Sequence, residues 1–183
     1  MSTVGTKLLT AEEFFQLTDP KDGSKRELVR GEVIVMPSPG FEHEEIQHNI
    51  ERLIKEFLRK QPIGRVVSGS EIIAEPDTVR GPGVSYYSKE RLPLEKRVVG
   101  YNDQPPDLCV EVLSPSNSRR ELRVKIKEYF FVGVKMVWVV EPDDRSIMIL
   151  RAPDEGRTFF DNALIDGGDV LPGFSCKVSD LFV

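Results

Sequence analysis

One short segment places the strongest constraint on the fold of this chain. It reads DLCVEVLSPS, and residues 108–113 are apolar except for Glu111. Strands covered on both faces have this composition. Apolar residues then recur at helical spacing from 122 to 130, and KMVWVVEPDDRSIMIL predicts a hairpin that turns at 142–144. A strand, a crossing helix and another strand predict a mixed α/β sheet.

The sequence before this segment predicts further helices and strands. LLTAEEFFQL predicts a short helix, because Thr10 and Glu13 have the spacing of a capping box. KRELVRGEVIVM predicts two strands joined by a tight turn at Arg30-Gly31. A long amphipathic helix is expected next, from residue 41 until Pro62 ends it.

Residues 64–88 contain three short β-rich runs separated by Gly, Pro and Asp, so helix gives way to sheet there. No internal repeat or change of composition divides the chain. We therefore expect a single domain over residues 1–183, of the mixed α+β class, with helices flanking a sheet.

Composition and charge exclude several classes of protein. No apolar run approaches the roughly 18 residues that cross a bilayer, and the acidic start MSTVGTKLLTAEEFF does not suit a signal peptide. A soluble, cytoplasmic protein with no membrane partner is expected. The net charge of −5 argues against a surface that is basic all over, although it leaves room for a local basic patch.

Cysteine and histidine give little support to a zinc site. Cys109 and Cys176 have no CxxC neighbour, so both are expected to be buried free thiols. His43 and His48 are separated by about 140° around a helix and therefore do not form a paired clamp.

Glu111 is the first candidate for chemistry, because a carboxylate inside an apolar strand is unfavourable unless it is paired or binds a metal. Pairing with an arginine is one interpretation. Lys125 favours the other, since it lies at the edge of the apolar stripe of the next helix and can reach back toward Glu111. An acid and a lysine so placed can hold a divalent ion and stabilise the charge on a phosphate.

A magnesium site usually takes a second acid from a neighbouring strand. Asp107 is separated from Glu111 by about 13 Å of extended strand, which is too far to share an ion. We assign Asp107 to the turn that enters the strand.

Five positive charges fall within nine residues of NSRRELRVKIKEYF, namely Arg119, Arg120, Arg123, Lys125 and Lys127. Such a run is either a solvated helix face or a surface that contacts nucleic-acid phosphates.

Four segments together resemble nearly the whole length of the Uma-two family of restriction endonucleases, in the PD-(D/E)XK nuclease superfamily. In chain order they read RELVRGEVIVMPSPGFEH, TVRGPGVSYYSKERLP, PPDLCVEVLSPSNSRRELRVKIKEYFFVGVKMVWVVEP and DVLPGFSCKVSDLF. The resemblance implies a restriction-endonuclease-like central mixed sheet flanked by helices, with a metal-dependent active site at one end.

The resemblance also implies roles for individual residues. Glu111 matches the core-strand acid that binds Mg²⁺ or Mn²⁺ in the family, and Lys125 matches the catalytic lysine. Tyr129 completes the Lys-x-x-x-Tyr pattern of the family. Glu27 and His43 match family positions to which we assign no firm role.

Gly83 departs from the family pattern. The family has Pro-Asp where this chain has Pro82-Gly83, so the position of one metal ligand carries no side chain. Gly-Pro-Gly is also an ordinary sequence for the loop that leads into a strand, so the other interpretation is that Gly83 is only a loop residue.

Two functions follow from these observations. One is a magnesium-dependent DNA endonuclease, in which Glu27, Glu71, Asp77 or an additional water replaces the missing aspartate. The other is a nuclease-fold protein that binds nucleic acid or a protein partner without cutting. Cleavage of both strands of a duplex would favour a symmetric homodimer.

Overall fold

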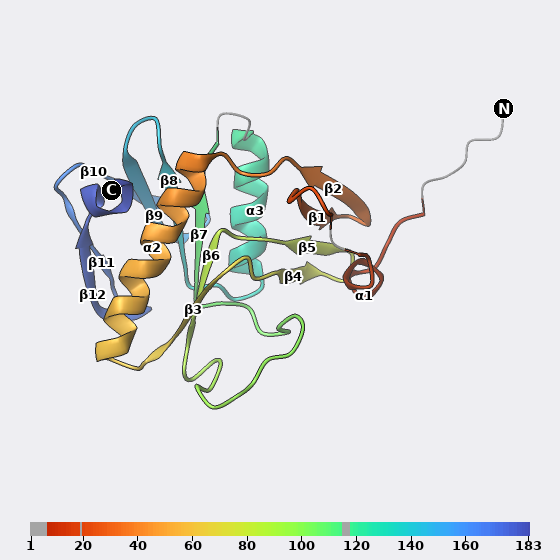
Figure 1. Cartoon of the computed structure of the whole chain (residues 1–183), viewed down its shortest axis with the longest axis horizontal. Helices are drawn as coiled ribbons and strands as arrows, with labels where there is room; N and C mark the ends of the chain where they lie inside the picture. Colours follow the sequence, from red (N-terminus) through yellow and green to blue (C-terminus); the bar gives the residue numbers. More distant parts are fainter. Residues whose placement is uncertain (1–6, 19, 115–117) are drawn as a thin grey trace.

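A six-stranded mixed sheet forms the centre of the molecule (Figure 1). The computed structural model describes residues 7–18, 20–114 and 118–183. The strand order is β10-β9-β8-β7-β6-β3. Neighbours pair antiparallel except β7 and β8, which are parallel. The bounds are β3 Gly64–Ser68, β6 Val84–Ser88, β7 Leu108–Val112, β8 Met136–Glu141, β9 Ser146–Ala152 and β10 Glu155–Phe160.

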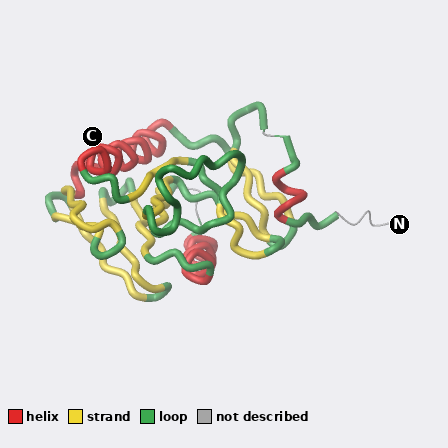
Figure 2. The backbone as a smooth tube through the Cα atoms, turned by 90° about the horizontal axis from the view of Figure 1, so that it is seen from below, coloured by secondary structure: helices red, strands yellow, loops and turns green. Residues whose placement is uncertain are grey.

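Two helices cover opposite faces of this sheet (Figure 2). Helix α2, Phe41–Lys60, packs its isoleucines against the face that carries Val110 and Trp138. Helix α3, Arg119–Phe131, packs against the face that carries Cys109. Because α3 is the right length to return the chain, β7-α3-β8 forms the predicted parallel unit, and the mixed α+β class is confirmed.

A second, four-stranded sheet lies beside the first, in the order β2-β1-β5-β4. Its bounds are β1 Lys25–Val29, β2 Glu32–Met36, β4 Ile72–Glu75 and β5 Thr78–Arg80. The β1–β2 turn at Arg30-Gly31 is confirmed, and both residues have the positive φ that such a hairpin requires. Residues 64–88 form four strands and not the predicted three, because a turn divides the segment between Glu75 and Thr78.

The ends of the chain complete the structure. Helix α1, Ala11–Phe15, begins at the predicted capping box. The hairpin of β11, Leu164–Gly167, with β12, Leu171–Lys177, and the 3₁₀ helix η1, Val178–Phe182, come from a region to which the sequence assigned no element. Both cysteines are buried and free, as expected. Within the described residues, no helix has the length and apolar character needed to cross a membrane.

Candidate active site

The structure brings Glu111 and Lys125 together near the end of β7. Lys125 Nζ lies 3.0 Å from Oε1 of Glu111, and the Tyr129 hydroxyl donates a hydrogen bond of 2.5 Å to the same oxygen. The side chains of Lys125 and Glu111 are only 15% and 12% exposed. Lys125 and Tyr129 are one turn apart on α3, so the crossing helix presents both to the strand that precedes it.

Glu27 extends this pair into a network of buried charges. Its carboxylate lies 2.8 Å from Lys125 Nζ and 2.9 Å from Nη1 of Arg80, and it accepts a hydrogen bond from the backbone N–H of Gly81. Arg80 also contacts Glu128 of α3 at 2.6 Å. We call Glu27, Arg80, Glu111, Lys125 and Glu128 the charge cluster. Three carboxylates and two cations give it a formal charge of −1.

The charges of the cluster stabilise one another. Burial by itself would raise the pKa of Glu27, but Lys125, Gly81 and Arg80 together hold that pKa below its usual value. Burial would lower the pKa of Lys125, and the neighbouring Glu111 and Glu27 instead raise it well above its usual value. Tyr129 has a strongly raised pKa, chiefly because it is buried, so its hydroxyl keeps its proton and donates to Glu111.

Arg80 and Glu128 were not predicted as site residues from the sequence. Arg80 ends the short strand β5 and is 7% exposed, an unusual burial for an arginine. Glu128 lies three residues after Lys125 on α3, a spacing that places two helical residues on one face. Neither residue has a local pattern that reveals its partner, because Arg80 and Glu128 are 48 positions apart.

Gly83 lies beside the strand that carries Glu111 and provides no carboxylate. It directly precedes β6, whose first residue, Val84, pairs with Val110, the neighbour of Glu111 on β7. A Cβ atom at Gly83 would lie 2.8 Å from Oε1 of Gln47 and 3.3 Å from the Val110 carbonyl oxygen. The space next to position 83 is therefore filled by the carboxamide of Gln47, a residue of α2 that was not predicted from the sequence to belong to the site.

His43 occupies the same helix one turn earlier. Its Nε2 donates a hydrogen bond of 2.9 Å to the carbonyl oxygen of Val112, at the end of β7. Burial and the nearby Lys25 lower the pKa of His43, which favours the neutral imidazole. Its Nδ1 is buried without a hydrogen-bond partner among the described residues.

The other acids considered in the sequence lie in different surroundings. Asp107 is buried at the start of β7, where it pairs with Arg91 and Lys135 and accepts a hydrogen bond from Ser88 N–H, as a residue that anchors the strand entry. Asp77 lies in the β4–β5 turn and accepts a bond from Thr78. Of the three acids proposed to replace the missing aspartate, Glu27 is the one that joins the charge cluster.

The described residues contain no group of three or more His, Cys, Asp or Glu side chains placed to hold a metal ion. Glu111 nevertheless offers a carboxylate, and Oε1 of Gln47, which has no hydrogen-bond partner in the described part of the chain, lies next to position 83. Carboxylate and amide oxygens are both ligands of hard divalent cations. The residues present thus fit Mg²⁺ or Mn²⁺ through a less charged set of donors than the family pattern provides.

The basic residues of α3 point in different directions from the helix. Lys125 points into the charge cluster, whereas Arg119, Arg120, Arg123 and Lys127 are exposed on α3. The three arginines occupy the first turns of the helix, which follows the end of β7 that carries Glu111.

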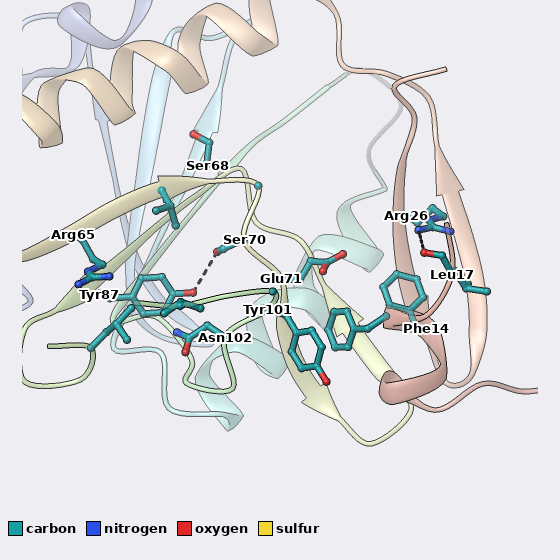
Figure 3. Close-up of a pocket in the computed structure, with 16 residues that line it drawn as sticks. Phe14, Leu17, Arg26, Arg65, Ser68, Ser70, Glu71, Tyr87, Tyr101 and Asn102 are labelled. Atoms are coloured by element: carbon teal, nitrogen blue, oxygen red, sulfur yellow. Dashed lines mark hydrogen bonds between the residues drawn. The ribbon is translucent and has the colours of Figure 1, made fainter. Parts of the chain in front are cut away.

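A separate cavity of about 500 Å³ lies between the two sheets and the loop at residues 98–102 (Figure 3). Phe15 stacks on Tyr101 at its wall with ring centroids 3.7 Å apart, and the Tyr87 hydroxyl donates to Ser70. Glu71 lines this cavity. None of the charge-cluster residues does, so the cavity and the candidate active site are distinct.

Comparison with known proteins identifies the fold and the family of this chain. The crystal structure of a "putative nuclease belonging to DUF820" from Anabaena variabilis superposes with a TM-score of 0.82, covering 95% of this chain and 97% of the other. At 24% identity, that likeness establishes the fold. A comparison with curated proteins gave no match. The Uma2 family, described as "Putative restriction endonuclease", matches residues 11–179, and the chain therefore belongs to the Uma2 family.

Proposed function

We propose that this protein is a metal-dependent endonuclease that hydrolyses phosphodiester bonds in DNA. The observation that carries the proposal is the contact of 3.0 Å between the Lys125 amine and the Glu111 carboxylate, at the end of the central sheet of a nuclease fold. Buried, interacting charges of opposite sign are typical of sites that stabilise reacting groups.

Each residue has a distinct task in this proposal. Glu111 would hold Mg²⁺ or Mn²⁺, and Tyr129 orients its carboxylate through the hydrogen bond to Oε1. The ion, when bound, supplies a polarised water and neutralises charge on the phosphate. Lys125, kept protonated by Glu111 and Glu27, stabilises the negative charge that develops on the phosphate oxygens.

DNA would contact the exposed start of α3. Arg119, Arg120 and Arg123 are exposed there and suit phosphate contacts, which are independent of base sequence. Cleavage of both strands of a duplex requires two active sites, and a symmetric dimer supplies them.

Plasmid cleavage tests the proposal. We expect the wild-type protein to cut supercoiled plasmid with Mg²⁺ or Mn²⁺ and to stop when EDTA is added. Glu111→Gln and Lys125→Met should each abolish cleavage, whereas Lys127→Met, on the exposed side of the same helix, should retain it. Cleavage that survives in Glu111→Gln would contradict the assignment of the site.

Gly83 favours a second candidate, a protein that binds DNA without cutting it. Position 83, where the family resemblance implies a second acid, carries no carboxylate, and a hydrolytic metal site with one acid is weakened. This alternative predicts salt-dependent DNA binding by the wild-type protein and no cleavage with either metal.

A further inference from the structure

Gln47 is an unusual residue for the buried side of α2. It is 5% exposed, and its Oε1 has no hydrogen-bond partner among the described residues. Buried carbonyl oxygens are nearly always paired, because an unpaired one loses its hydration without compensation. An oxygen left in this state is suited to a ligand that the protein chain alone does not supply.

The position of Gln47 indicates which ligand. Its Oε1 lies 2.8 Å and its Cδ lies 3.2 Å from the point that a Cβ atom of residue 83 would occupy. The backbone of Gly83 does not have the positive φ that would itself demand glycine. An aspartate at position 83 and a glutamine at position 47 would therefore compete for one space, and in this chain the glutamine fills it.

The surrounding residues connect this space to Glu111. Gly83 directly precedes Val84, which pairs with Val110, the neighbour of Glu111 on β7, and the carbonyl oxygen of Val110 borders the same space at 3.3 Å. One turn before Gln47, His43 bonds to Val112, the residue that follows Glu111 on β7. The first two turns of α2 thus lie against the segment of β7 that carries the acid.

We propose that Oε1 of Gln47 replaces the missing carboxylate of position 83 and, together with Glu111, binds the divalent cation. This inference rests on the proposed function and identifies a ligand beyond those that the resemblance implies. An amide oxygen is a hard, neutral donor that Mg²⁺ and Mn²⁺ accept. Because it adds no negative charge to the cluster, the site should bind the cation more weakly than one with two carboxylates.

Calorimetric titration of the full chain with MnCl₂ tests the inference. We expect Gln47→Leu, which keeps the buried volume but removes the oxygen, to weaken binding at least about tenfold, the lower end of the losses caused by altering metal-site support. Gln47→Glu should tighten binding, because it adds a charged oxygen at the same place. Gln61→Leu, an exposed glutamine just beyond the end of α2, is the matched control and should bind like wild type.

The outcomes separate this inference from the proposed function. If Glu111→Gln loses Mn²⁺ while both Gln47 variants bind it like wild type, the metal site stands and the role of Gln47 is wrong. If wild type and Glu111→Gln bind Mn²⁺ equally or not at all, both proposals are wrong. Should Gln47→Leu fail to fold, tighter binding by Gln47→Glu still supports the inference, and unchanged binding still overturns it.

Discussion

Lys125→Met removes the cation that joins Glu27 to Glu111 and keeps a side chain of similar length. Both carboxylates are largely buried, and Lys125 contacts them at 2.8 and 3.0 Å. Removing one partner of a buried ion pair costs about 3–5 kcal/mol. Because Arg80 and Gly81 still contact Glu27, and Tyr129 still donates to Glu111, we expect the lower end, about 3 kcal/mol.

Urea unfolding and thermal denaturation measure this loss. For a chain of this size, 3 kcal/mol lowers the melting temperature by roughly 6–12 °C. Lys127→Met is the control and should change the free energy of unfolding by no more than about 0.5 kcal/mol, because Lys127 is exposed. The double variant Glu27→Gln with Lys125→Met should lose less free energy of unfolding than the sum of the losses in the two single variants. If Lys125→Met is no less stable than Lys127→Met, the lysine does not hold the cluster together.

Three further predictions follow from the cluster and its surroundings. Folding lowers the pKa of Glu27, so ionised Glu27 stabilises the folded protein above its ordinary pKa of 4.5. This stability is lost as the pH falls through the lower pKa of the folded state. Melting temperatures measured below pH 4.5 should therefore fall more steeply for wild type than for Glu27→Gln. Gly83→Asp alone should lower the free energy of unfolding, measured in urea, by about 1–3 kcal/mol, because its Cβ meets Gln47. The double variant Gly83→Asp with Gln47→Ala should recover this stability and bind Mn²⁺ more tightly. A single variant as stable as wild type would contradict the crowding of Gln47 by a side chain at position 83. Three exposed arginines of α3 are replaced together with alanine, namely Arg119, Arg120 and Arg123. The slope of the logarithm of DNA affinity against the logarithm of salt concentration should fall by roughly one unit per lost phosphate contact. An unchanged slope would show that these arginines form a solvated helix face.

Local patterns predicted those parts of the fold that local interactions decide. The hairpin turn at Arg30-Gly31 and the cap at Thr10 depend on residues within a few positions of each other. An apolar strand followed by a helix with one apolar stripe predicted the β7-α3-β8 unit. The same pattern predicted that Lys125 on the helix would reach Glu111 on the strand.

The rest of the site depends on contacts between distant segments. Glu27 reaches Lys125 only because β1 belongs to a second sheet packed beside the first, and no local pattern indicates that the strands divide into two sheets. Gln47 follows Ile46 on α2 and resembles any polar helical residue. Its importance depends on the missing side chain at Gly83, 36 positions later, and a single sequence does not show that the two positions share one space.

A crystal of the wild-type protein soaked in MnCl₂ and measured for anomalous scattering tests the central claim most directly. We predict one Mn²⁺ peak at the end of β7, with a Glu111 carboxylate oxygen and Oε1 of Gln47 both within about 2.5 Å of the ion. A peak bound by Glu111 without Gln47 would leave the metal site in place and remove Gln47 from it. Full soaking with no anomalous peak at Glu111 would contradict a metal-dependent active site in this protein.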